Sequence, residues 1–465
     1  MVQQQESDKA AAKRTMREVH PHTAGIDVGS RSHWVAVGAE RDAQPVREFG
    51  SFTGDVAKMA DWLASCGVTT VAMESTGVYW IPVYDVLEAR GFEVLLVNAK
   101  HVRNVPGRKS DVKDCQWLQQ LHGFGLLRGS FRPTQEILEL RTYTRQRSRI
   151  VRDAARCVQH MEKAMLEMNL QLHHVISELT GVTGMAILRA IVSGERDGRK
   201  LAELRDRRCR EPKEKLAAAL QGTFKNELVF VLEQSLSAYD HQIQMLAKCD
   251  ERIEQTLAVL EKAALEKLAR EGKEPQPCPP PKPRQVKGNQ PKFEIQSPLH
   301  RICGDIDITQ IIPLGTALNF VAEVGTDMSR WPTEKHFASW LSLAPGTHIT
   351  GGQSLSGKRG PAKNRAGLIL RQAAVAIGKT PTALGGFYRR LSARGLGSTA
   401  AIATARKIAV FIYRALKYGR PLRDVGLAAY EQQFQDRQVR HLGKRAAALG
   451  YQIVPIPTQA AAGPN

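Results

Sequence analysis

The chain has 465 residues, enough for roughly two to four domains. Its 66 Lys and Arg residues outnumber its 46 Asp and Glu residues and give a formal net charge of +20, which predicts a polyanionic partner such as nucleic acid. No uncharged apolar run reaches the roughly 18 residues of a membrane span, and residues 1–20 lack the apolar core of a signal peptide. We therefore exclude a membrane protein and expect a cytoplasmic one.

The cysteines indicate neither a zinc site nor a disulfide framework. The seven residues are scattered along the chain, and no two have the CxxC spacing of a zinc ligand pair. Reduced thiols are the simplest interpretation.

The first part of the chain predicts a disordered arm over 1–20 and an α/β domain over 21–130. TAGIDVGS, HWVAVGAE and PVREFGSFT have the composition of three strands joined by tight turns. Further elements are expected in the order helix (54–65), strand (69–75), helix (78–91), strand (92–99) and helix (110–125). The order β-β-β-α-β-α-β-α predicts a ribonuclease H-like fold, in which helices flank a mixed sheet.

The rest of the chain reads as mainly helical. Apolar residues recur at heptad spacing in two stretches of the region 131–271, with a break at Asp250, which predicts an antiparallel helical pair or an intermolecular coiled coil. A Pro-rich linker is expected over 272–298, a compact, mainly α C-terminal domain over 299–425, and a basic tail over 426–465.

Four carboxylates stand where the predicted sheet could gather them. Asp27 ends the first strand, Glu74 ends the fourth, and Asp111 and Asp114 share the first turn of a helix. Converging carboxylates repel one another, and Mg²⁺, or Mn²⁺ in its place, relieves that repulsion and can assist phosphoryl transfer. Individually, each residue could instead cap a turn, lie on the surface or favour a helix N-terminus.

Cations lie close to this acidic set and predict contact with nucleic acid. The loop before the last helix carries Lys100, Arg103, Arg108 and Lys109 as phosphate clamps. The helix that follows the domain carries an arginine stripe: Arg141, Arg145, Arg149, Arg152 and Arg156. Because Arg binds phosphate bidentately, we favour contact with a nucleic-acid backbone over an ordinary solvated face.

A second candidate site lies in the Gly-rich stretch 343–374. It combines hydroxyl groups with cations: Thr350, Ser354, Ser356, Lys358, Arg359, Lys363, Arg365 and Arg371. A flexible loop of this composition could attack a phosphate covalently, with the cations stabilising the charge that develops on oxygen. A DNA-contacting loop without a covalent role is the alternative.

The chain resembles the DEDD-type transposases of bacterial insertion sequences, which are related to the Piv-type DNA invertases. One block, about residues 23–130, contains GIDVGS, MESTGVYW and the KSDVKD helix. The other, about residues 305–390, contains PLGTALNFVAEVG, WLSLAPG, GGQSLSG and KNRAG. The helical region between the two blocks corresponds to the spacer of that family.

The resemblance implies a resolvase-like N-terminal domain that binds Mg²⁺ through Asp27, Glu74, Asp111 and Asp114. It also implies a C-terminal transposase domain whose serine nucleophile forms a covalent link to DNA. Where the family commonly has Ser-Ser-Gly or Ser-Gly-Gly, this chain has Thr350-Gly351-Gly352 after Ile349. Thr350 matches by position and Ser354 and Ser356 match by chemistry, so the identity of the nucleophile stays open.

The expected function is therefore cleavage and rejoining of DNA strands at the ends of an insertion element and at its target. The resemblance further implies double-stranded DNA and a structured guide RNA as partners, a homodimer or homotetramer, and a nucleoid-associated bacterial protein. Two alternatives remain: a hydrolytic Holliday-junction-type resolvase, which needs only the carboxylates, and a DNA- or RNA-binding protein without catalysis.

Overall fold

A computed structural model describes residues 18–75, 77–98, 111–280, 290–356, 364–420, 422 and 424–454. The chain divides into two compact units, Met1–Arg132 and Pro133–Asn465, and the boundary predicted after residue 130 lies close to this division. The helical region and the C-terminal domain, which we predicted separately, both lie in the second unit. Within the part of the chain that the structure describes, no helix is both long enough and apolar enough to cross a membrane.

The first unit contains a five-stranded mixed sheet with the strand order β3-β2-β1-β4-β5. The strands are β1 (Thr23–Val28), β2 (Ser32–Val37), β3 (Val46–Gly50), β4 (Thr70–Glu74) and β5 (Glu93–Val97). The β1–β2 and β2–β3 pairs are antiparallel, whereas the β1–β4 and β4–β5 pairs are parallel. The predicted mixed sheet flanked by helices is confirmed, with β1 at its centre.

The two faces of this sheet are covered by different helices. Strand residues alternate between the faces, and Ala24, Ile26 and Val28 of β1 belong to a core that they share with α2 (Thr53–Ser65) and α3 (Trp80–Ala89). The opposite face is covered by α5 (Asp111–Gly123), which packs against β1, β2 and β4.

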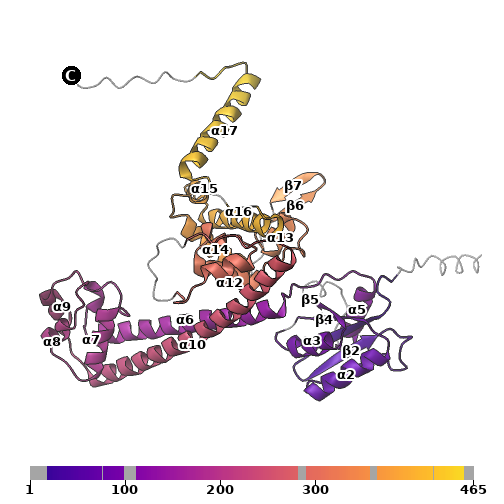
Figure 1. Ribbon diagram of the computed structural model, residues 1–465, viewed down its shortest axis with the longest axis horizontal. Helices are drawn as coiled ribbons and strands as arrows, with labels where there is room; N and C mark the ends of the chain where they lie inside the picture. Colours follow the sequence, from indigo (N-terminus) through magenta and orange to yellow (C-terminus); the bar gives the residue numbers. More distant parts are fainter. Residues whose placement is uncertain are drawn as a thin grey trace, which may run out of the picture. The chain divides into compact units, whose positions relative to one another are not determined.

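Two long helices, α6 (Gln135–Glu167) and α10 (Asn226–Arg270), form an antiparallel pair within the second unit (Figure 1). At Asp250, where the heptad pattern is interrupted, the two helices are joined by an ion pair. Arg147 Nε of α6 lies 2.5 Å from Asp250 Oδ1 of α10. The sequence between the two helices forms a small helical cluster that consists of α7 (Val182–Val192), α8 (Gly198–Glu203) and α9 (Lys213–Ala219). Its apolar core is shared with the end of α6 and the start of α10.

The C-terminal part of the second unit is mainly helical. Its elements are α11 (Gln296–Ile302), α12 (Leu314–Val324), α13 (Glu334–Trp340), the hairpin β6 (Thr347–Thr350) and β7 (Gln353–Ser356), α14 (Arg365–Ile377), α15 (Ala383–Ser392), α16 (Gly397–Tyr418) and α17 (Leu427–Ala448). Buried Ile295 and the start of α11 show that ordered packing resumes inside the linker predicted over 272–298.

Candidate functional site

Asp27 and Glu74 occupy equivalent ends of two neighbouring strands. Parallel β1 and β4 pair Gly25 with Ala72 and Ile26 with Met73, so the next residues on the two strands are Asp27 and Glu74. Ile26 and Met73 point into the core beneath α2 and α3. By alternation, both carboxylates belong to the opposite face, which α5 covers.

Helix α5 approaches that face closely because Gly25 has no side chain. A Cβ at Gly25 would lie 2.3 Å from the Cys115 carbonyl oxygen and 2.4 Å from the Gln119 nitrogen. Farther along α5, Gln119 Nε2 donates to Thr23 Oγ1 at 3.1 Å. These contacts show that α5 is antiparallel to β1. The N-terminal turn of α5 therefore lies at the end of the sheet where β1 and β4 finish.

Two of the candidate acids contribute to the electrostatic environment of Cys115. Burial is the main cause that raises the pKa of this thiol to about 12, and the negative charges of Asp27 and Asp114 raise it further. Asp114 is half-buried, whereas Asp111 is exposed.

The donor set suits a divalent cation, since carboxylate oxygens are the hard ligands that Mg²⁺ prefers. The described residues, which include all four candidate acids, nevertheless contain no group of three or more His, Cys, Asp or Glu side chains at metal-binding spacing. The structure thus brings the acids to one end of the sheet without closing a metal site. The predicted phosphate clamps Lys100, Arg103, Arg108 and Lys109 lie outside the described residues.

The second candidate site is a β-hairpin, where we had expected a flexible loop. Gly351 and Gly352 connect β6 to β7 with φ values of 58° and 78°, a left-handed conformation that glycine adopts without strain and that tight hairpin turns require. Thr350 is exposed beside this turn and pairs with Gln353. In the same ladder, Ser354 pairs with Ile349 and Ser356 pairs with Thr347. Lys358, Arg359 and Lys363 lie outside the described residues.

The segments on either side of the hairpin are bound to each other. Asn364 caps α14 by accepting a hydrogen bond from the Gly367 nitrogen at 3.0 Å, and its amide donates to the Trp340 carbonyl oxygen at 2.9 Å. Arg371 Nη2 donates to the Ser342 carbonyl oxygen at 3.1 Å. The chain that enters the candidate site and the helix that leaves it are therefore held together.

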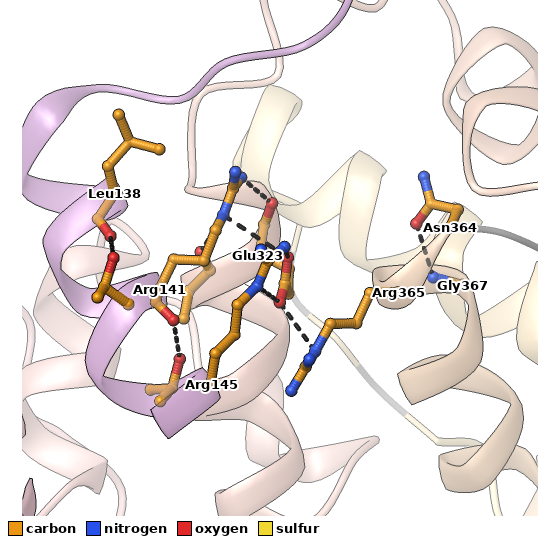
Figure 2. A network of polar contacts seen from close by, with 10 residues as sticks. Leu138, Arg141, Arg145, Glu323, Asn364, Arg365 and Gly367 are labelled. Carbon is orange, nitrogen blue, oxygen red and sulfur yellow. Dashed lines mark hydrogen bonds and ion pairs between the residues drawn. The ribbon is translucent and has the colours of Figure 1, made fainter. Parts of the chain in front are cut away.

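Three arginines converge on the buried carboxylate of Glu323 in α12 (Figure 2). Arg145 donates to its two oxygens from Nε at 2.8 Å and from Nη2 at 2.7 Å, and Arg365 Nε lies 3.1 Å from Oε1. Arg141 Nη2 donates to the Glu323 carbonyl oxygen at 2.6 Å. Glu323 therefore joins α6 to the first residue of α14.

Burial distinguishes Arg141 from the rest of the predicted arginine stripe. Desolvation lowers the pKa of Arg141 to about 10, against the opposing influence of the Glu323 charge. The structure gives Arg141, Arg145 and Arg365 a protein partner that our sequence reasoning missed. The available signal was Glu323 itself, the lone acid in the apolar stretch NFVAEVG.

The remaining arginines of the stripe are exposed. Arg152 Nε donates to the Ser148 carbonyl oxygen of its own helix, and Arg156 pairs with Asp153 on the same helix at 3.3 Å. Arg149 is exposed as well. These three side chains still present positive charge to the solvent on α6.

Two family models match the chain. One describes a transposase, the DEDD transposase of IS110, and matches residues 24–170; the other describes the transposase IS116/IS110/IS902 family and matches residues 312–388. The first match contains the four candidate acids, and the second contains Glu323, the hairpin and Arg365. No curated protein matches the chain. The chain therefore belongs to the DEDD-type family of insertion-sequence transposases, enzymes that transpose DNA.

Proposed function

We propose that this transposase cleaves and rejoins DNA strands by a phosphoryl transfer that combines the acids at the end of the first unit's sheet with a hydroxyl group of the β6–β7 hairpin. The observation that carries the proposal is the parallel register of β1 and β4. It puts Asp27 and Glu74 at neighbouring strand ends, on the face against which α5 packs. The strand order and the flanking helices support a ribonuclease H-like domain.

The acids have the chemistry to hold divalent cations. Asp27, Glu74, Asp111 and Asp114 would bind Mg²⁺ or Mn²⁺, which supplies positive charge to the attacking and leaving oxygens of a phosphoryl transfer. The protein's part is to fix the backbone at the strand ends and to bring Asp114 alongside through the Gly25 contact with α5.

The hairpin supplies the candidate nucleophiles. The hydroxyl oxygen of Thr350, Ser354 or Ser356 would bond to phosphorus and lose its proton, while the bond from phosphorus to the leaving sugar oxygen breaks and that oxygen takes up a proton. The strand is then linked to the protein as a phosphodiester. Attack by a sugar hydroxyl of a second strand reverses these steps and releases the protein.

The same proposal covers the polyanionic partners. Exposed Arg149, Arg152 and Arg156 would contact the backbone of double-stranded DNA or of a structured guide RNA, together with the cations around both candidate sites. Arg365, which is held by Glu323, would position the chain that follows the β6–β7 hairpin. A homodimer or homotetramer could supply the two sites from different subunits, in a protein associated with the bacterial nucleoid.

A suicide-substrate assay tests the proposal. The full-length protein is incubated with nicked DNA that carries the sequences flanking the coding region, with and without Mg²⁺ and with and without RNA transcribed from the same DNA. We expect a denaturation-resistant adduct in Mg²⁺ that disappears with Asp27→Asn and with one of Thr350→Ala, Ser354→Ala or Ser356→Ala. Metal-dependent cleavage without an adduct would indicate a hydrolytic resolvase. DNA binding without cleavage and without an adduct would indicate a non-catalytic protein.

A further inference from the structure

A small cavity lies among helices α15, α16 and α17, most of it beyond the residues that the second family model matches. Its volume is about 190 Å³. Beside the cavity, α17 packs close to α15 at Gly386, where a Cβ would lie 2.7 Å from Leu427 Cδ1 and 3.0 Å from Tyr430 Cδ1. The first turns of α17 are thereby held against the C-terminal domain, and they form one wall of the cavity.

The charge that lines this cavity is of one sign. Four of its lining side chains are cations, namely Arg390, Arg394, Lys407 and Arg437, and none of the described lining residues is acidic. In the described part of the chain, none of these four cations forms an ion pair. This arrangement contrasts with Arg145 and Arg365, whose charges are balanced by Glu323. Clustered cations without a protein counter-ion favour the binding of an anion.

Aromatic rings hold two of the cations in place without neutralising them. The guanidinium carbon of Arg390 lies 3.3 Å from the Phe434 ring centroid, and its Nη1 donates to Tyr430 Oη at 3.0 Å. Lys407 Nζ lies 4.1 Å from the Phe387 ring centroid. A cation over a ring face keeps its full charge, so these contacts order the cavity while leaving its charge available to a ligand.

The pKa of Lys407 is lowered, as expected for a cation beside other cations. Burial lowers the pKa of its ammonium group, and the positive charge of Arg437 lowers it further. The charged and titratable groups that line the cavity together with Lys407 are Arg390, Arg394, Tyr430 and Arg437, and the Phe387 ring lies against its ammonium group. No described carboxylate among them offsets the repulsion, which a bound anion would relieve.

Basic residues continue along α17 beyond the cavity. Arg440, Lys444 and Arg445 follow Arg437 at helical spacing, and all three are exposed. Such a continuous row matches an extended polyanion rather than a single inorganic ion. Cations combined with aromatic rings are typical of sites for nucleic-acid strands, whereas an acidic peptide would gain nothing from the rings.

We propose that the cavity among α15, α16 and α17 binds the phosphodiester backbone of a nucleic-acid strand, with Arg437, Lys407, Arg390 and Arg394 around one phosphate. The cavity shares no lining residue with either candidate catalytic site. It binds without divalent metal, and it would hold a strand on α17 whatever chemistry occurs elsewhere. DNA and RNA share the recognised group, so either could be the natural ligand.

Photo-crosslinking of the full-length protein tests this inference. Hexanucleotides of DNA or RNA that carry a single thio-substituted base are irradiated with the protein in EDTA, which stops metal-dependent cleavage, and crosslinked peptides are identified by mass spectrometry. We expect crosslinks within residues 383–440. The pair Lys407→Gln and Arg437→Gln should reduce them at least tenfold, as should the pair Arg394→Gln and Arg437→Gln.

A matched control separates this site from a general loss of charge. Lys267→Gln with Arg270→Gln removes two exposed cations from the last turn of α10 and should leave the crosslinks unchanged. Melting curves check that each variant is folded. Absence of crosslinks from 383–440, or equal losses in the site and control pairs, overturns the inference. So does displacement of the hexanucleotides by an oligo-glutamate peptide at equal charge concentration. Crosslinking with DNA alone or RNA alone identifies the natural ligand.

Discussion

Arg145 and Glu323, which are 178 residues apart in the sequence, form a two-pronged ion pair with N–O distances of 2.8 and 2.7 Å. The carboxylate of Glu323 is 7% exposed and also receives Arg365. The pair connects α6 to α12, and the contact with Arg365 extends the connection to α14, the helix that follows the β6–β7 hairpin. Three cations surround this one buried carboxylate. Within this group of four side chains, loss of Glu323 would therefore leave the most charge unbalanced.

Replacement of this carboxylate by an amide should destabilise the second unit. Glu323→Gln keeps the side-chain shape but removes the negative charge that three guanidinium groups share, and we expect the free energy of unfolding to fall by about 3 kcal/mol, within the range for breaking a buried ion pair. Glu334→Gln, which breaks the more exposed pair with Arg414, is the control and should cost less than about 1 kcal/mol. Urea denaturation measures both, and equal losses would contradict the assigned role of Glu323.

The ion pair between Arg147 and Asp250 should obey the rule for buried pairs. Their side chains are 11% and 15% exposed. Asp250→Ala removes the carboxylate that balances the buried charge of Arg147 and should cost about 3 kcal/mol, whereas Arg147→Met combined with Asp250→Leu should be nearly neutral or stabilising. Urea denaturation of the two variants checks this. A double variant as unstable as the single one would show that the charges themselves support the helical pair.

A methyl group at Gly25 should disturb the first candidate site. The Cβ of Gly25→Ala would clash with the backbone of α5 at Cys115 and Gln119. We expect a loss of about 1–3 kcal/mol in unfolding free energy, as for overpacked cores, and loss of DNA cleavage as α5 moves away from β1. Gly54→Ala, where the new Cβ meets nothing within 4 Å, is the control and should retain both properties. Wild-type cleavage activity in Gly25→Ala would show that the position of α5 does not affect DNA cleavage.

The stability of the first unit should depend on pH through His122. Burial, and then the nearby charge of His20, lower the pKa of His122 from 6.5 to about 4, and its ring lies 2.8 Å from Thr70 Oγ1. The unfolded state therefore binds the extra proton first, so the stability is complete above pH 6.5 and declines as the pH falls towards 4. The loss is at most about 3 kcal/mol.

Hydrogen exchange of α5 between pH 4 and 7, corrected for the intrinsic rates, measures this loss. His122→Gln keeps a polar partner for Thr70 but cannot titrate, so its exchange should vary less with pH than that of the wild type. An unchanged pH dependence in the variant would assign the effect to other groups.

The strands of the first unit could be predicted from the sequence because the signals that identify them are local. Alternation along GIDVGS and VAMES identifies the strands and the face that carries Asp27 and Glu74, and the order of the elements implies which strands are neighbours. The dipeptide Gly351-Gly352, flanked by short strand-like runs, also signalled a two-residue hairpin. We had interpreted it as a flexible loop because the surrounding glycines and cations dominated the composition.

The ion pairs of the second unit could not be predicted from local pattern. Arg145 meets Glu323 only because α6 and α12 pack together, and nothing in the spacing of the arginines distinguishes a buried partner from a phosphate. Asp250 interrupted a heptad pattern, and the residue opposite it depended on the register of two helices that are far apart in sequence. Such contacts follow from tertiary packing, which composition and periodicity do not specify.

Metal binding tests the central claim most directly. Titration of the full-length protein with Mn²⁺, followed by electron paramagnetic resonance, should reveal bound metal. We predict that Asp27→Asn, Glu74→Gln and Asp114→Asn each weaken this binding at least tenfold, because each removes a charged oxygen ligand. Asp85→Asn, which alters an exposed acid on α3, should leave it unchanged. Equal Mn²⁺ affinity in the wild type and in the first three variants would contradict a shared metal site formed by these acids.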